Sequence, residues 1–65
     1  MALEKSVKEH LDKVVGLKKA VVKVSEKVDM VRGYTVFEAS YELAVEFGID
    51  KEVLIDYILE YRGLK

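Results

Sequence analysis

The 65-residue chain has no cysteine, and it also lacks proline, tryptophan, asparagine and glutamine. Without cysteine it forms neither a disulfide nor a thiolate metal site. Its single histidine excludes a metal site built from several histidines of one chain. The longest apolar runs have only three residues, as in 53–55, whereas a membrane-spanning helix needs about 20. With no signal peptide visible, we expect a cytoplasmic protein that has no membrane span and no cofactor.

The same absences bear on stability. A chain this short buries only about 60% of the surface that its unfolded form exposes, so it depends on good helix packing or on self-association. Few thermolabile residues combined with frequent Lys and Glu are typical of hyperthermophile proteins and equally of designed helical proteins. The sequence does not choose between these origins, and both predict a thermostable domain.

Apolar residues recur at seven-residue spacing along residues 3–31, in two registers. The members of the two registers are Val7, Val14, Val21 and Val28, and Leu3, His10, Leu17, Val24 and Val31. Such a repeat places its members on one side of a helix. We therefore predict one long N-terminal helix, about 44 Å long at 1.5 Å per residue. Gly16 lies inside this repeat and predicts a kink, a close helix contact or a true break into two shorter helices.

The second half of this stretch permits two interpretations. From Val22 to Met30 the apolar residues also alternate with polar ones, which is typical of a strand. Because the helical repeat continues through the same residues without a shift, we favour a helix over 20–31 and keep a strand as the alternative.

The remaining chain contains signals for two shorter helices. Thr35 followed three residues later by Glu38 forms a capping box, which predicts a helix from Val36 that Gly48 ends. The predicted buried face of this helix consists of Val36, Ala39, Ser40, Leu43, Ala44 and Phe47. Asp50 is placed to cap a third helix from Lys51 to about Arg62, which Gly63 ends.

The third predicted helix is apolar around much of its circumference. We therefore expect it to pack on two neighbours or across a dimer interface. The predicted fold class is all-α. Residues 1–65 form a single domain, a small three-helix bundle with one long N-terminal helix and a short helix-turn-helix pair.

Residues 40–59 resemble the helix-turn-helix of small prokaryotic regulators and some antitoxins. Ala44, Gly48 and Leu54 carry this resemblance, because in those proteins a small residue permits close helix approach and a glycine makes the turn. The resemblance implies DNA binding by the third helix. The acidic residues exposed on that helix oppose DNA binding, because a recognition helix lies among phosphates.

Residues 28–59 also resemble a ubiquitin-associated-type three-helix domain. Gly33 and Tyr34 stand where that family has its Met-Gly-Phe/Tyr loop, and residues 54–59 are similar to its last helix. The chain departs from the family in having Arg32 at the Met position and one extra residue after Gly48. The resemblance implies a protein-binding module with Gly33 and Tyr34 in its contact loop.

Charge is divided unevenly between the two halves of the chain. Residues 1–33 carry eight Lys/Arg and five acids, a balance of +3, whereas residues 34–65 carry three Lys/Arg and seven acids, a balance of −4. Rows of like charge recur at four-residue spacing: Lys19, Lys23 and Lys27 in the first helix, Glu38, Glu42 and Glu46 in the second, and Glu52, Asp56 and Glu60 in the third. These rows are either solvated faces or surfaces that steer association.

Catalysis finds little support in the sequence. His10 has Ser6 one turn before it, but a serine and a histidine on one helix face do not make a catalytic cleft. We interpret His10 as a packed or partly exposed residue of the helix repeat. A polar residue there is also placed to fix the register between paired helices.

We therefore expect a non-enzymatic, self-associating or protein-binding helical module, with a DNA-binding regulator or antitoxin-like protein as the alternative. The expected partner is a second copy in a homodimer or another protein. Nucleic acid is disfavoured, and no membrane is expected. The candidate interaction surface comprises Lys19, Lys23, Lys27, Glu52, Asp56, Tyr57, Glu60 and Tyr61.

Overall fold

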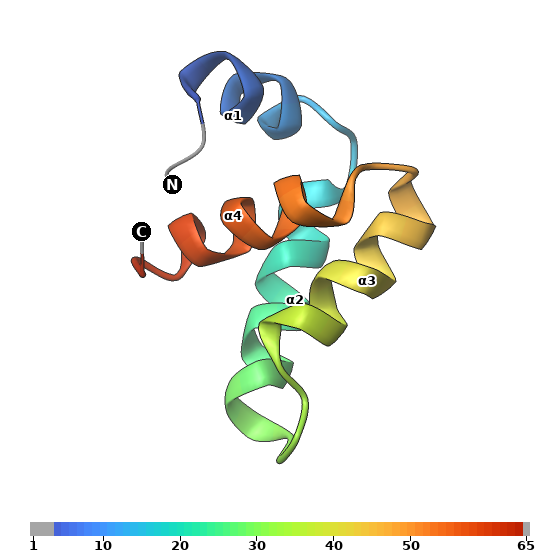
Figure 1. Ribbon diagram of the computed structural model, residues 1–65, viewed down its shortest axis with the longest axis vertical. Helices are drawn as coiled ribbons and strands as arrows, with labels where there is room; N and C mark the ends of the chain where they lie inside the picture. The colour runs from blue at the N-terminus through green and yellow to red at the C-terminus, as the bar shows by residue number, and fades with distance from the viewer. Residues whose placement is uncertain (1–3, 65) are drawn as a thin grey trace.

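The computed structural model describes residues 4–64, and its regular elements there are four helices. They are α1 (Lys5–Asp12), α2 (Leu17–Met30), α3 (Val36–Phe47) and α4 (Lys51–Tyr61). The helices α2 and α3 run side by side in opposite directions, and α4 crosses between them and α1 (Figure 1). The all-α prediction is confirmed for the described residues, and residues 20–30 are helical rather than a strand.

The prediction of one long N-terminal helix is wrong, because the chain breaks at residues 13–16. Gly16 adopts a left-handed conformation with a φ of +83°. The consecutive β-branched residues Val14 and Val15 precede it, and such residues are weak helix formers. The three-helix bundle is therefore a four-helix domain in which the break, left open as one reading of Gly16, separates α1 from α2.

The break lets α1 fold back over α4. Leu11, which stands outside both seven-residue registers, is 3% exposed in the core as a result. The Tyr57 hydroxyl donates a hydrogen bond to Asp12 Oδ1 over 2.6 Å, and Lys8 Nζ lies 2.9 Å from Glu60 Oε1. Leu3, the first member of the repeat, lies outside the described residues.

The structure confirms the two predicted helix starts, because the expected capping hydrogen bonds are present. Thr35 and Glu38 form both hydrogen bonds of the capping box at the start of α3. The Asp50 carboxylate accepts a hydrogen bond from the backbone N–H of Glu52 over 2.8 Å. Each bond satisfies a backbone donor that the first turn of a helix leaves free.

The core lies where all four helices meet, and α4 is at its centre. The buried apolar residues are Leu11, Leu17, Val21, Ala39, Leu43, Leu54, Tyr57 and Ile58. The α4 helix bonds to α1 through Tyr57. Arg62, the residue that follows α4, bonds to α2, because its Nη1 donates to the Ser25 carbonyl over 2.9 Å. The apolar surface of α4 therefore packs against other helices of the same chain, including α3.

Candidate protein-interaction surface

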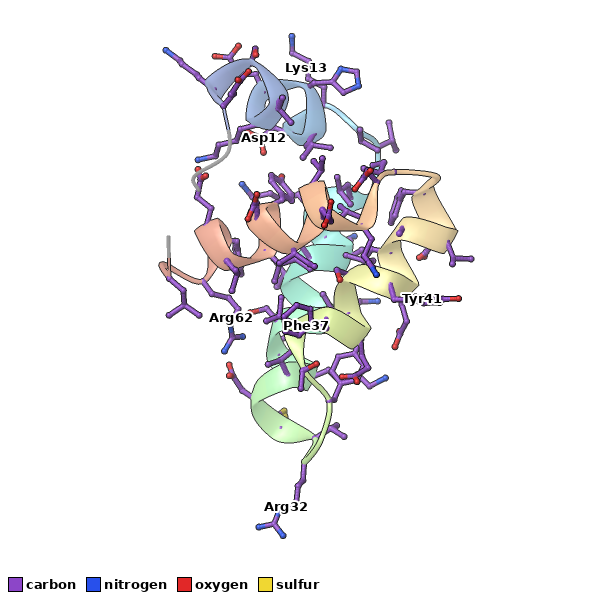
Figure 2. All side chains as sticks on the ribbon, viewed as in Figure 1. Asp12, Lys13, Arg32, Phe37, Tyr41 and Arg62 are labelled. Atoms are coloured by element: carbon purple, nitrogen blue, oxygen red, sulfur yellow. The ribbon has the colours of Figure 1, made fainter. Side chains whose placement is uncertain are left out.

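A row of large apolar side chains is exposed along α3. Phe37, Tyr41 and Val45 are four residues apart, so they lie on successive turns of one side of the helix. Their exposed fractions are 67%, 61% and 72%. Figure 2 labels Phe37 and Tyr41 on this helix. We call these three residues the α3 stripe. It lies beside the predicted buried face, whose six residues are buried or partly buried as expected.

An acidic row borders the α3 stripe. Glu38, Glu42 and Glu46 are each one position further along α3 and are exposed. The Thr35 side chain and backbone hydrogen bonds hold the pKa of Glu38 below its ordinary value of 4.5. The helix contains three glutamates and no basic residue. Its exposed side is therefore apolar along one half and negatively charged along the other.

A shallow hollow of about 240 Å³ opens at the N-terminal part of the stripe. It is lined by Phe37, Glu38 and Tyr41 of α3 and by Lys51 of α4. A hollow of this volume has room for one inserted side chain beside Phe37, Tyr41 and Lys51.

The basic row of α2 faces the acidic row of α3 across a groove of about 420 Å³. Lys19 and Lys23 line one bank of the groove, and Glu42 and Glu46 line the other. Among residues 4–64, the ion pairs within 4 Å lie elsewhere, so no salt bridge connects the lysines on one side of the groove with the glutamates on the other. The structure thus brings the predicted lysine row opposite the α3 glutamates, and not opposite the acidic row of α4.

Lys27, the third member of the basic row, has a different neighbour. Its Nζ lies 4.3 Å from the centroid of the Tyr34 ring, a cation–π distance. Burial, and then the nearby Glu42 carboxylate, raise the pKa of Tyr34 to about 12. Tyr34 is packed against the core and against Lys27, so it is not a freely projecting loop residue.

The predicted residues of α4 are spread over several environments. Tyr57 is 3% exposed, so it lies in the core and not on a surface, and its hydroxyl is held by Asp12. Glu60 pairs with Lys8, which raises the pKa of that lysine. Tyr61 is partly exposed beside this pair. Glu52 is exposed at the start of α4, and Asp56 is half-buried.

The structure gives His10 and Ser6 exposed positions on α1. In residues 4–64 no group of three or more His, Cys, Asp or Glu side chains is placed to hold a metal ion. None of the described helices combines the length and the apolar character that a membrane crossing demands.

Sequence reasoning missed the α3 stripe as a surface. The predicted interaction surface includes Tyr57 and Tyr61 but not Tyr41. The signal that identifies the stripe is a second set of apolar residues at four-residue spacing, one position after Val36, Ser40 and Ala44. A helix with two adjacent apolar rows has more apolar surface than its neighbours in a small domain can cover.

Comparison with known proteins adds no family to this picture. No protein family model, curated protein or solved structure matches the chain.

Proposed function

We propose that this chain is a small non-catalytic module that binds a protein partner through the exposed side of α3. The α3 stripe is the observation that carries the proposal. Three large apolar side chains that are about two-thirds exposed on successive turns contribute little to the fold of the monomer. Contiguous apolar surface of this kind marks interaction sites on soluble domains.

The energetics indicate how large the contact must be. Burying a fully exposed side chain of this size contributes about 1.5–3 kcal/mol, so covering the stripe contributes roughly 3–6 kcal/mol. Association itself costs about 4–15 kcal/mol in lost freedom. The stripe alone is therefore an anchor, and a stable contact must extend onto neighbouring surface such as the acidic row.

DNA binding through a helix-turn-helix remains the alternative function, and the short connection between α3 and α4 supports it. Gly48, with a φ of +67°, makes a tight turn between α3 and α4. The placement of α4 does not support its use as a recognition helix, because α1 covers one side of it and its exposed start carries Glu52. A helix that enters the major groove needs a free side with basic or amide groups.

Site-specific photo-crosslinking tests the proposed function. A photoreactive phenylalanine analogue replaces Tyr41 in the stripe, and the matched control carries it at Val15, which is 93% exposed and lies outside α3. Irradiation in a cell extract should give discrete adducts from position 41 and few from position 15, and irradiation of the purified chain shows whether a second copy is captured. Equal yields from both positions, or none from position 41, would contradict the proposal.

The two function classes also separate in a mobility-shift assay. A DNA-binding protein retards duplex DNA at low salt and releases it steeply as salt rises. We expect no retardation. Retardation that Lys19→Ala or Lys23→Ala weakens would favour the alternative.

A further inference from the structure

We infer that the α3 stripe binds an amphipathic helix of another protein, one that carries Lys or Arg beside its apolar residues. This inference rests on the proposed function and adds the class of partner.

The stripe has the shape that an amphipathic helix fits. From Phe37 to Val45 it follows one helix over about 12 Å at 1.5 Å per residue. An amphipathic helix presents anchors at three- and four-residue spacing over the same distance. The hollow beside Phe37, Tyr41 and Lys51 receives one such anchor.

The charge beside the stripe selects a basic partner. The acidic row lies between the stripe and the lysines of α2, as the residues lining the α2–α3 groove show. Within the described chain, Glu42 and Glu46 have no ion pair within 4 Å. A partner helix on the stripe therefore has one edge over carboxylates that no Lys or Arg of the described chain pairs with within 4 Å. Such complementarity contributes to specificity and to the rate of association.

A second copy of this chain fits the stripe less well. If two stripes packed antiparallel about a twofold axis, both acidic rows would fall on the same side of the contact and repel each other. If they packed parallel, each acidic row would meet the opposite border of the partner's stripe, where Lys51 lines the hollow. If a whole aromatic side chain has about 200 Å² of surface, the exposed parts of Phe37 and Tyr41 together amount to roughly 250 Å². A standard interface needs about 800 Å² per partner, so a dimer would have to extend over the glutamates.

Titration with designed peptides tests this inference. The basic probe is a helical peptide with leucines at three- and four-residue spacing and lysines beside them. The acidic probe replaces every lysine with glutamate, and a scrambled basic peptide has no apolar face. Calorimetry measures affinity, and amide chemical shifts of the isotope-labelled full chain locate the contact. We expect the basic probe to bind on α3 and its affinity to fall as salt rises.

Matched variants separate the apolar contribution from the charged one. Tyr41→Ser should weaken the basic probe about tenfold or more, whereas Val15→Ser should leave its affinity unchanged. Glu42→Gln should weaken binding less and reduce its salt dependence, and Glu9→Gln on α1 is its control. All four positions are exposed, so the fold persists, and the amide spectra check this for each variant.

The remaining outcomes separate failure of this inference from failure of the proposed function. Equal binding of the acidic probe to the stripe, or binding of the basic probe outside α3, would overturn the inference. If no probe binds while the crosslinker at position 41 captures a second copy, the proposed function stands and the basic partner does not. If no probe binds and the crosslinker captures nothing, both fail.

Discussion

Gly16 separates α1 from α2, so its backbone conformation should control the stability of the fold. Its φ of +83° lies in the left-handed region, where an L side chain costs about 1–2 kcal/mol. Among residues 4–64, a Cβ added at this position would meet only Phe47 Cε1, at 3.9 Å, which is an ordinary contact. We therefore expect Gly16→Ala to lower the free energy of unfolding by about 1–2 kcal/mol, through the backbone alone.

A continuous helix predicts the opposite sign. In a helix interior, alanine is more stable than glycine by about 1 kcal/mol. Urea unfolding followed by circular dichroism distinguishes the two cases, and chemical synthesis supplies a matched control with D-alanine at position 16. The D-residue accepts a positive φ and restricts the unfolded chain, so it should raise stability by about 0.4–1 kcal/mol. A stabilising L-alanine together with a destabilising D-alanine would refute the break.

Three further predictions follow from composition and from the long-range hydrogen bonds. Calorimetry should give a melting midpoint above the range of about 45–65 °C that is typical of mesophile domains, and a midpoint within that range would contradict the compositional argument. Tyr57→Phe should cost about 1 kcal/mol at neutral pH. Because burial and Asp12 raise the Tyr57 pKa above its ordinary value of 10.0, the wild type should lose stability as the pH rises past that value, and the variant should lose less. Arg62 holds the pKa of Asp29 below its ordinary value of 3.8, so the stability that Asp29 provides is present at neutral pH and is lost as the pH falls below that value. Asp29→Asn should flatten this decline in urea unfolding, whereas Glu26→Gln, an exposed control on the same helix, should not.

The parts of the fold that were predicted correctly depend on short-range chemistry. Thr35 and Glu38 are three residues apart, and Asp50 caps a donor two residues away. Such signals act within one turn, so they can be read without knowledge of the rest of the molecule. The same is true of the glycines that end α3 and α4, because each terminates a helix through its own backbone conformation.

The break at residues 13–16 could not be predicted from the seven-residue repeat, because the contacts that stabilise the break are nonlocal. The seven-residue repeat runs through Gly16 unchanged and indicates a straight helix on local grounds. The turn becomes favourable because Leu11 enters the core and Asp12 receives a hydrogen bond from Tyr57, 45 residues away. The sequence of residues 3–31 alone does not indicate the contact between Asp12 and Tyr57.

The same reason explains the mixed outcome for the candidate surface. Four-residue spacing groups Lys19, Lys23 and Lys27 on one side of a helix, but it does not show which residues lie opposite them. Tyr57 belongs to the same stretch as Glu60 and Tyr61, yet the fold-back of α1 covers it. Membership of a helix side can be read from sequence, whereas exposure of that side is decided by the tertiary arrangement.

The α3 stripe shows why an exposed apolar row carries information that a buried one does not. A buried residue such as Leu43 is explained by the core that it fills. Phe37 and Tyr41 remain mostly exposed, so burial within the monomer does not explain their size, and a smaller polar residue on the same turn would keep the helix equally well. If these side chains are present for a partner, their replacement by serine must remove binding while leaving the free energy of unfolding almost unchanged. Loss of stability in step with loss of binding would instead assign them to the fold.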